Sequence, residues 1–344
     1  MERIFEEIKT KIGKANKIAL FTHMNCDCDG IGSMLGLYNF LIENCKDVDM
    51  FVDSEIPDRF KFLKNIEKIN IKENETKDAF IKEENLFTVT IDFDKYDLLI
   101  SLDTSNLERL GKFASAYKNH KNTINIDHHK NNTNYGIVDY VRKYSSNGEV
   151  LYEIMKEMGM NISQTTATCI FSAISSDTNR FSNSNITSKT HLFASELINL
   201  GADHNLVNTC LFKNKTKEQL NLISFMAKNL KFYKGVSYFY MRLKDIKKLG
   251  VKSSDVSTFM YIIGNVSDSK ITLAIKERGD KLYRIGLRST DNYDVSKVAS
   301  MFGGGGHVNA SGCEIKGNFK KEFKRVLQEC VREIVSKDAK LDKN

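Results

Sequence analysis

Residues 17–45, KIALFTHMNCDCDGIGSMLGLYNFLIENC, decide the fold. The run KIALFTH (17–23) is apolar and predicts a buried strand, whereas GIGSMLGLYNFLIENC (30–45) has the length and pattern of a helix. A polar turn that carries His23, Asp27 and Asp29 joins the two. A buried strand that passes through such a turn into a helix is the repeating unit of α/β proteins with a mostly parallel sheet.

The rest of the first half repeats this alternation. Further strands are predicted at VDMFVDS (48–54), YDLLISLDTS (96–105) and NTINIDHHK (122–130). Helical patterns dominate from 147 to about 229, including 163–178 and 188–201. We therefore expect an α/β fold whose N-terminal domain is a mostly parallel sheet flanked by helices.

The second half of the sequence has a different pattern of predicted elements. Residues 231–243, 270–278 and 283–289 are predicted as strands, a glycine run follows at 303–306, and the amphipathic segment 319–336 predicts a last helix. These elements predict a smaller α/β domain. We place a catalytic domain at 1–205, a helical linker at 206–230 and a substrate-binding domain at 231–344, in line with about 150 residues per domain.

Composition narrows the class of protein. The net charge of +7 in 344 residues leans only mildly towards anionic partners. Seven cysteines, an odd number, indicate reduced thiols and not a disulfide framework. The longest apolar run, 259–263, is far below the roughly 18 residues that cross a bilayer, and no export signal opens the chain. We expect a cytoplasmic protein without a membrane partner.

Acid and imidazole groups follow the predicted strands at their carboxyl ends, where ligands bind in open parallel sheets. Oxygen-rich sites with a few imidazoles suit manganese or magnesium. Carboxylates that converge would repel one another unless cations lie among them, and two ions about 3.5–4 Å apart with a shared carboxylate would resolve this repulsion. The residues concerned are His23, Asp27, Asp29, Asp103, Asp127, His128, His129 and Asp177.

Other interpretations of the single residues remain open. An aspartate after a strand is often a helix cap or a turn residue. His23, Cys26 and Cys28 also resemble half of a zinc site, although no second pair with matching spacing follows. If the turn is extended, Asp27 and Asp29 face one way and the two thiols face the core.

Five segments in order resemble the motifs of the DHH phosphoesterase superfamily with its associated C-terminal domain. The resemblance covers residues 17 to 318 and is nearest to the bacterial nanoRNase/pAp-phosphatase type. Cys26 stands where the family usually has proline, and Cys28 where a small residue is common. The segments are HMNCDCDGIGS (23–33), SLDTSNLERLG (101–111), NIDHHKNN (125–132), SSDTNRFSNSNITSKTH (175–191) and GLRSTDNYDVSKVASMFGGGGHVNASGCEI (286–315).

The resemblance implies two manganese ions, with magnesium or cobalt as alternatives, and assigns their ligands. His23, Asp27 and Asp103 would hold one ion, and Asp29, Asp103, His128 and Asp177 the other. Asp103 would bridge the two ions, Asp127 would orient the neighbouring histidine, and His129 would stabilise the scissile phosphate or donate a proton to it.

The glycine run offers backbone N–H groups for a phosphate, although by itself it is equally a flexible turn. The resemblance assigns this region to the far end of the substrate, with Arg288 and His307 as the first choices because arginine binds phosphate in a fork. The substrate residues implied are Arg288, Ser289, Gly303, Gly304, Gly305, Gly306, His307 and Asn309. The last helix is either a docked helix or a nucleic-acid arm.

The resemblance implies a manganese-dependent phosphodiesterase that cuts short oligonucleotides and linear dinucleotides (pApA, pGpG) to 5′-mononucleotides. Removal of the 3′-phosphate from pAp and hydrolysis of cyclic di-AMP are related activities. The partners expected are these small nucleotides, not long duplexes, and the resemblance allows a homodimer. The alternatives are a pyrophosphatase or polyphosphatase, a RecJ-like single-strand exonuclease, and a nucleotide sensor, which the six intact ligand positions disfavour.

Overall fold

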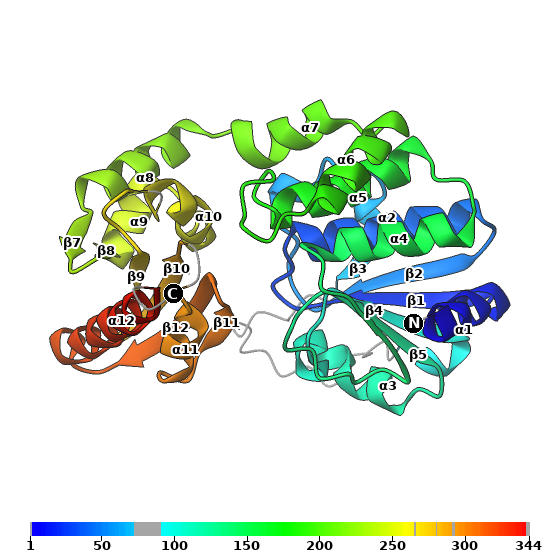
Figure 1. The fold of residues 1–344 in the computed structure, drawn as a ribbon, viewed down its shortest axis with the longest axis horizontal. Coiled ribbons are helices and arrows are strands. Elements are labelled where there is room, and N and C mark those ends of the chain that lie inside the picture. The colour runs from blue at the N-terminus through cyan, green and yellow to red at the C-terminus, as the bar shows by residue number, and fades with distance from the viewer. Residues whose placement is uncertain (1, 72–90, 265, 280, 291–292, 342–344) are drawn as a thin grey trace, which may run out of the picture. The chain divides into compact units, whose positions relative to one another are not determined.

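The computed structural model describes residues 2–71, 91–264, 266–279, 281–290 and 293–341. The chain divides into two compact units, Met1–Asn214 and Lys215–Asn344, each with its own sheet (Figure 1). The predicted helical linker 206–230 spans the boundary between the two units, and it is mainly helical on both sides of that boundary. Its role as a linker between a catalytic and a substrate-binding domain stays a prediction, because the two units are defined by packing alone.

The sheet of the first unit confirms the predicted parallel α/β architecture. Its six strands lie in the order β3-β2-β1-β4-β5-β6, and all neighbouring pairs are parallel. The short strands β3 and β6 are absent from the sequence prediction. The strands are β1 (Lys17–Thr22), β2 (Asp47–Val52), β3 (Ile69–Ile71), β4 (Leu98–Leu102), β5 (Thr123–Asp127) and β6 (Val138–Val141).

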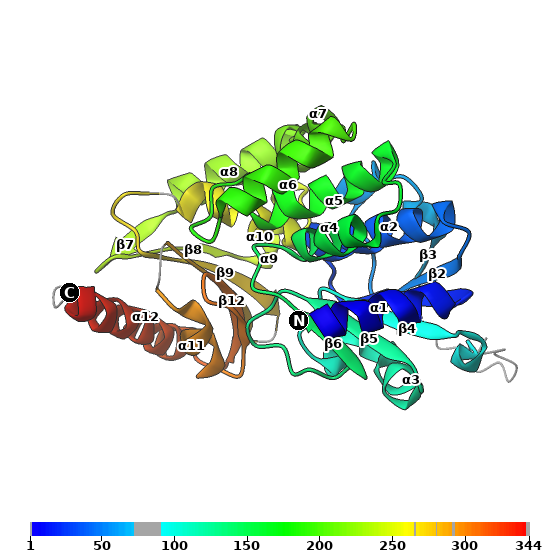
Figure 2. The same cartoon turned by 45° about the vertical axis from the view of Figure 1, so that its right-hand side comes forward.

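Helices cover both faces of this sheet (Figures 1 and 2). Along β1, Ile18 and Leu20 face the larger core beneath α2, α4 and α5, whereas Ala19 and Phe21 face an aromatic core beneath η4 and α3. The helices are α1 (Glu2–Lys14), α2 (Cys28–Glu43), α3 (Ala114–Asn119), α4 (Asn147–Met158), α5 (Gln164–Asp177), α6 (Ser188–Asn199) and α7 (His204–Asn208), with short turns η1 (Asp58–Phe60), η2 (Ile66–Lys68), η3 (Phe93–Lys95), η4 (Leu107–Phe113) and η5 (Thr209–Lys213).

The strand order places a topological switch between β1 and β4. From β1 the chain proceeds outward to β2 and β3, and then returns to β4 on the other side of β1. The loops that leave β1 and β4 therefore diverge and open a crevice at the carboxyl ends of these strands, where α/β proteins bind ligands.

The second unit holds a mixed six-stranded sheet in the order β11-β12-β10-β9-β8-β7. The predicted single strand 231–243 is wrong. It is a hairpin, because Lys234 and Gly235 both adopt positive φ in a two-residue turn, as tight hairpins require. The strands are β7 (Lys231–Tyr233), β8 (Val236–Met241), β9 (Ile271–Gly279), β10 (Leu282–Ser289), β11 (Gly305–His307) and β12 (Ala310–Lys316).

Two groups of helices pack on opposite faces of this second sheet. Val326, Cys330 and Ile334 of α12 pack into one core, which shows that the last helix is docked by its apolar side. Phe239 and Met241 of β8 enter the other core with α8 and α10. The helices are α8 (Lys217–Lys228), α9 (Leu243–Leu249), α10 (Ser253–Gly264), α11 (Val295–Ser300) and α12 (Phe319–Leu341). Within the described part of the chain, no helix is both long and apolar enough to span a membrane.

Close packing of α2 on α5 requires glycine at position 32. A Cβ there would lie 2.7 Å from the backbone carbonyl oxygen of Cys169, which cannot move aside without shifting α5. Gly13 of α1 has open space around it. We expect Gly32→Ala to lower the free energy of unfolding by about 1–3 kcal/mol through overpacking, and Gly13→Ala to leave it unchanged or raise it slightly. Urea unfolding of both variants measures this, and equal midpoints would contradict the packing argument.

Candidate active site

The turn after β1 presents His23 and Asp27 to the crevice and buries the two thiols. Asp27 is the N-cap of α2, and its Oδ1 accepts hydrogen bonds from the N–H groups of Asp29 and Gly30. The turn is therefore a helix start and not an extended segment. Cys26 and Cys28 are nevertheless buried in the larger core, as predicted, and burial raises the pKa of the Cys26 thiol to about 11. Among the described residues, the groups with metal-ligand spacing contain no cysteine, which disfavours a zinc site at this turn.

Asp103 follows β4 directly and stands at the centre of the crevice. Its φ of 55° lies in the left-handed region, which non-glycine residues adopt uncommonly. The two carboxylate oxygens point to different partners. Oδ2 lies 3.7 Å from Nε2 of His23, and Oδ1 lies 3.4 Å from Nε2 of His128. One carboxylate thus faces two separate groups of donor atoms.

Each of these groups contains further carboxylates. Next to His23, Asp27 places Oδ1 3.8 Å from the imidazole Nε2. Next to His128, Oδ2 of Asp29 lies 3.6 Å and Oδ2 of Asp177 lies 3.8 Å from the imidazole Nε2. Asp177 is the last residue of α5. The structure therefore brings together the six predicted ligand residues from four segments of the chain, although their role as ligands stays a prediction.

Asp29 is held at the N-terminus of α4. Its Oδ2 accepts a hydrogen bond of 2.7 Å from the N–H of Asn147, and its Oδ1 accepts one of 3.0 Å from the N–H of Gly148. These unpaired N–H groups and the helix dipole stabilise a carboxylate. The contact orients Asp29 across 118 residues of sequence, which no local pattern reveals.

Asp127 and His129 form a hydrogen-bonded pair beside this cluster. His129 donates from Nδ1 to Oδ1 of Asp127 at 2.7 Å, and the side chain of Asn132 donates to Oδ2 at 2.6 Å. Asp127 is fully buried. Its two oxygens are thus occupied in orienting neighbours, which supports the orienting role predicted for it.

Backbone carbonyl oxygens contact the imidazole rings of His128 and His23 and orient them. Nδ1 of His128 lies 3.2 Å from the carbonyl oxygen of Tyr144, and Nδ1 of His23 lies 2.9 Å from that of Met24. When Nδ1 of His128 carries the proton and donates it to the carbonyl, Nε2 keeps its lone pair for a metal. Nδ1 of His23 also lies within reach of Arg109, which can only donate. In both histidines it is Nε2 that faces the carboxylates.

The cluster is electrostatically costly without cations. Burial and the charges of Asp103 and Asp27 raise the pKa of Asp177 to about 7, and burial with the charges of Asp103 and Asp177 raises that of Asp29 well above its usual value. Burial alone would lower the pKa of His23, but the nearby carboxylates of Asp103 and Asp27 raise it to about 10. The group therefore holds extra protons that a bound cation would displace.

Three features of the cluster fit divalent metal ions. Oδ1 of Asp103 is buried without a hydrogen-bond partner among the described residues. The spacings of 3.4–3.8 Å between donor atoms are too long for hydrogen bonds, and they approach the 3.0–3.4 Å or so expected of ligands about 2.1 Å from one ion. Among the described residues, the groups with metal-ligand spacing contain only aspartate and histidine.

Sequence reasoning missed two residues that shape this site. Nη2 of Arg109 lies 3.0 Å from Nδ1 of His23, which places a cation beside the crevice. Asn132 holds Asp127 and also bonds the side chain of Asn125. Both lie inside the quoted motifs, and a motif does not say which of its polar residues turns inward.

The glycine run of the second unit is largely used by the fold. The N–H groups of Gly303 and Gly304 already donate to the carbonyls of Ser300 and Ala299 at the end of α11. A Cβ on Gly304 would lie 2.2 Å from the carbonyl oxygen of Gly312, so close packing on β12 requires glycine there. Gly305 and Gly306 both belong to β11 and pair with Gly312 and Ser311 of β12. The predicted phosphate nest is thus limited to fewer N–H groups than the sequence indicates.

The remaining predicted substrate residues surround this hairpin. Ser289 and Asn309 bond each other at 3.0 Å, and the backbone of His307 ends β11, but its side chain lies outside the described part. Arg288 is half-buried, and its Nη1 donates to its neighbour's carbonyl oxygen at 2.9 Å. Their role in binding substrate stays a prediction.

Lys276 is a further basic residue that the sequence analysis did not single out. It is only 6% exposed on β9, opposite Arg284 of β10, and burial together with the charges of Arg278, Arg284 and Arg288 lowers its pKa to about 8. Within the described residues, neither Lys276 nor Arg288 has a carboxylate partner. The ammonium of Lys276 donates to the carbonyl oxygen of Ser253 and to the hydroxyl of Ser257 at 3.0 Å each. Basic groups without a carboxylate partner can attract an anion.

Two family models match the chain. Residues 17–174 match the DHH family N-terminal domain, and residues 235–333 match the DHHA1 domain. The chain therefore belongs to the DHH phosphoesterase family, and it is a hydrolase. The motifs that surround the metal-ligand cluster all lie in the first of these ranges or directly after it.

Known relatives cover nearly the whole chain. A protein of Mycoplasma genitalium named bifunctional oligoribonuclease and PAP phosphatase NrnA is 28% identical over 94% of this chain and 96% of its own length. Among solved structures, an exopolyphosphatase-related protein from Bacteroides fragilis is 23% identical, with a TM-score of 0.85 over 97% of this chain and 96% of that one. RecJ of Thermus thermophilus in complex with Mn²⁺ is 12% identical, with a TM-score of 0.53 over 96% of this chain and 55% of that one. The two structures support the fold.

Metal binding is expected to weaken as pH falls through about 7. A proton on Asp177, whose pKa is raised to about 7, competes with a cation, and below that pH the proton is held. We expect calorimetric titration with Mn²⁺ to give a dissociation constant about tenfold or more lower at pH 8 than at pH 6, and Asp177→Asn to weaken this dependence. Equal affinities at the two pH values would contradict the expectation.

Gly30 keeps space open beside the first group of donor atoms. A Cβ there would lie 2.4 Å from Oγ1 of Thr22, 3.3 Å from Oδ2 of Asp103 and 3.5 Å from Nε2 of His23. We expect Gly30→Ala to reduce bound manganese from two ions per chain to one, measured by elemental analysis after gel filtration. Gly13→Ala is the matched control because it adds the same methyl group in open space. Two ions in Gly30→Ala would refute this arrangement.

Proposed function

We propose that this protein is a manganese-dependent phosphodiesterase that hydrolyses linear dinucleotides and very short oligonucleotides to 5′-mononucleotides. The observation that carries the proposal is the carboxylate of Asp103, whose two oxygens face two groups of metal-type donors. Membership of the DHH family and a relative named oligoribonuclease and PAP phosphatase support the reaction class. Removal of the 3′-phosphate from pAp and hydrolysis of cyclic di-AMP belong to the same proposal.

His23, Asp27 and Asp103 would hold one ion, and Asp29, Asp103, His128 and Asp177 the other. Two bound divalent ions supply charge neutralisation for the phosphate and acidify a water near neutral pH. Magnesium or cobalt could replace manganese, since the donor set of carboxylates and imidazoles accepts each of them.

His129 acts on the substrate itself in this proposal. Asp127 accepts the Nδ1–H of His129, which orients the ring and stabilises its protonated form. A protonated imidazole can donate from Nε2 to a phosphate oxygen or to the oxygen that leaves. Arg109 contributes a fixed positive charge beside His23, where the charge on a phosphate would be stabilised.

The second unit would bind the end of the substrate that is not cut. Arg288 and Lys276 are basic side chains without a carboxylate partner among the described residues, and Arg288 can bind a phosphate by two hydrogen bonds. Ser289, Asn309 and the backbone of Gly305 and Gly306 would complete this site with hydroxyl, amide and backbone donors.

A pyrophosphatase or polyphosphatase is the second candidate, and a RecJ-like exonuclease the third. The separate basic site in the second unit favours a nucleotide over pyrophosphate. Incubation with manganese and labelled pApA, pGpG, pAp, cyclic di-AMP and pyrophosphate separates these activities. We expect turnover of the linear dinucleotides. Release of phosphate from pyrophosphate alone, or turnover of none of these compounds, would refute the proposal.

Asp127→Asn tests the role of the Asp127–His129 pair. The amide retains the size of the side chain but cannot stabilise a protonated imidazole as a carboxylate does. We expect kcat for pApA to fall about 10²–10⁴-fold, while KM and the manganese content change little. The matched control is Asp139→Asn, on the neighbouring strand β6 and outside the cluster. A fall in manganese content equal to the loss of rate would instead assign Asp127 to the metal site.

A further inference from the structure

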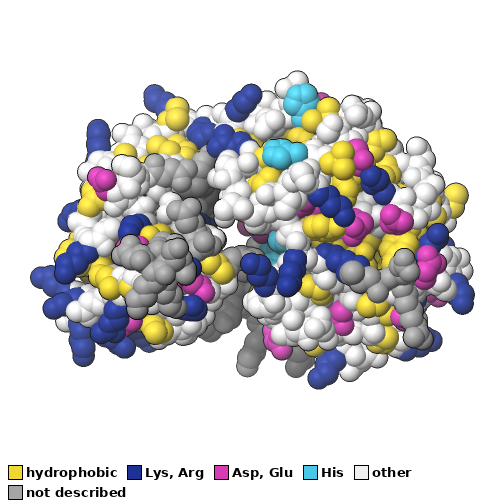
Figure 3. Space-filling view, in the orientation of Figure 1, with side chains coloured by type: hydrophobic (Ala, Val, Ile, Leu, Met, Phe, Trp, Pro, Cys, Tyr) yellow, Lys and Arg dark blue, Asp and Glu magenta, His cyan; other side chains and the backbone are white. Residues whose placement is uncertain are grey.

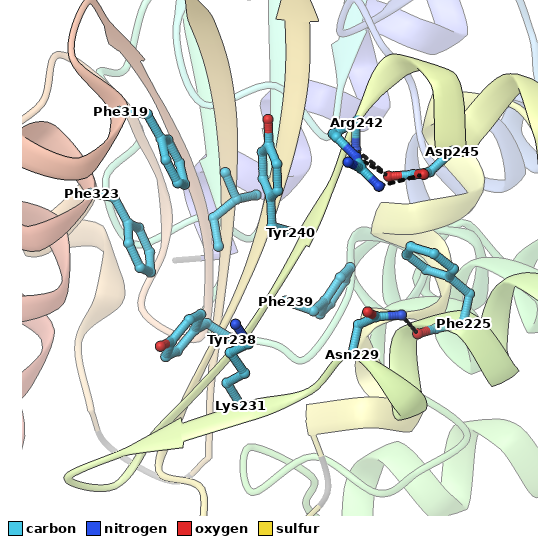
Figure 4. Close-up of a pocket in the computed structure, with 11 residues that line it drawn as sticks. Phe225, Asn229, Lys231, Tyr238, Phe239, Tyr240, Arg242, Asp245, Phe319 and Phe323 are labelled. Carbon is cyan, nitrogen blue, oxygen red and sulfur yellow. Dashed lines mark hydrogen bonds and ion pairs between the residues drawn. The ribbon is translucent and has the colours of Figure 1, made fainter.

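A groove in the second unit has no part in the reaction proposed above. It measures about 320 Å³ and lies beside strand β8, between helices α8 and α12 (Figure 4). Its walls are unusually rich in aromatic side chains. The residues that form it are Phe225, Asn229, Lys231, Tyr238, Phe239, Tyr240, Arg242, Asp245, Ile275, Phe319 and Phe323.

The groove exists because β8 is only partly covered at the edge of the sheet. Strand β7 pairs with Val236–Tyr238 alone, so it leaves the outer side of Phe239–Met241 without a strand partner among the described residues. Phe225 of α8 and Asn229, which follows that helix, form one wall, and the start of α12 forms the opposite wall. The groove therefore lies open along a strand edge.

Four aromatic rings on the α12 side hold one another in place. The ring centroids of Tyr240 and Phe319 lie 5.0 Å apart, and those of Tyr238 and Phe323 lie 5.1 Å apart. Phe319 and Phe323 are nearly parallel, with 6° between their planes. All four side chains are only half-buried. Mutually packed rings of this kind present flat apolar faces at little further cost in conformational entropy.

The second unit as a whole is strongly positive, and the groove itself is lined by Lys231 and by Arg242, which is paired with Asp245. Residues 215–344 contain 26 Lys and Arg against 14 Asp and Glu, a net charge of +12, whereas residues 1–214 contain 25 against 30, a net charge of −5. Lys231 is exposed on the wall of the groove, and Lys320 and Lys324 project from the outer face of α12. Figure 3 shows Lys and Arg side chains gathered over this unit.

We propose that this groove binds the unpaired bases of a single-stranded oligonucleotide. Sites for single strands combine a basic surface with aromatic faces on which bases stack, and every base has such a face. The phosphates would lie against the lysines at the rim, and one or two bases would stack on Tyr240 and Phe323. Gly305–His307 form the opposite edge of the same sheet, so the groove is distinct from the predicted phosphate site.

Other occupants fit the groove less well. A second copy of the chain docked here would bring two units of charge +12 together, which repel each other. A peptide added at the edge of β8 would use backbone hydrogen bonds and would not need the aromatic faces or the basic rim. The inference rests on the proposed function only in that the strand bound here is a longer relative of the dinucleotide substrates.

The test compares Tyr240→Leu and Phe323→Leu with Phe232→Leu. The control removes an aromatic ring on β7 that is 54% exposed and does not line the groove. Fluorescence anisotropy of the manganese-loaded protein with a labelled 12-nucleotide oligoadenylate, linked by phosphorothioates to resist cleavage, measures binding without turnover. We expect both groove variants to bind about 5- to 100-fold more weakly, the range for loss of a base–aromatic stack, and the control to bind as the wild type does.

Two further readouts decide between the outcomes. We expect Tyr240→Leu to hydrolyse pApA at the wild-type rate and Lys231→Gln to lower the salt dependence of 12-mer binding by about 0.7 in log–log slope. Unchanged 12-mer binding in both aromatic variants, or equal losses for the 12-mer and for pApA, would overturn the inference. A change of sedimentation with intact 12-mer binding would assign the groove to a second copy of the chain.

The design keeps the two proposals separate. If the protein turned over no dinucleotide but lost 12-mer binding in the groove variants, the proposed function would fail and this inference would stand. Equal unfolding midpoints show that a variant is folded. If an aromatic variant did not fold, Lys231→Gln would still test the groove, because Lys231 is exposed and its replacement leaves the core intact. The control is Lys316→Gln on β12, and the quantity compared is the salt dependence of 12-mer binding in the two variants.

Discussion

Repulsion among the carboxylates of Asp29 and Asp103, which are buried, and Asp177, which is half-buried, is the constraint on which the rest of the first unit depends. The parallel sheet brings the ends of β1 and β4 together at the switch in strand order, and α5 adds its last residue. The fold offsets the repulsion in part. The N-terminus of α4 stabilises Asp29, and His23 and His128 supply positive charge when they are protonated. Cations of higher charge would offset it further, and the left-handed backbone of Asp103 directs one oxygen to each group of donors.

The two units differ in net charge, which fits the separate roles proposed for them. The first unit is acidic overall and concentrates its carboxylates where metal ions would be held, whereas the second carries a net charge of +12. In the second unit, Arg288 would bind the substrate phosphate near the glycine-rich edge, and the aromatic groove at the other edge would bind bases. The net charge of +7 for the whole chain is therefore the sum of two units whose net charges have opposite signs.

Local pattern was enough to predict the long strands, the helices that follow them and the polar residues at their carboxyl ends. It failed where the structure depends on distant contacts or on single backbone angles. The contact of Asp29 with α4 spans 118 residues, and the inward orientation of Arg109 and Asn132 follows from packing. Strands β3 and β6 are too short for periodicity to mark them. At the glycine run the sequence pattern predicted too much. It indicated an anion site, but the N–H groups of Gly303 and Gly304 cap the end of α11, and Gly304 packs closely on β12.

The central claim is that Asp103 bridges two metal ions. Electron paramagnetic resonance during titration with Mn²⁺ tests it most directly, because two ions about 3.5–4 Å apart with a shared carboxylate are magnetically coupled. The account predicts that the six-line signal of isolated Mn²⁺ is replaced by a coupled spectrum as the second equivalent binds. A signal of isolated ions that grows in proportion to both equivalents would contradict the account.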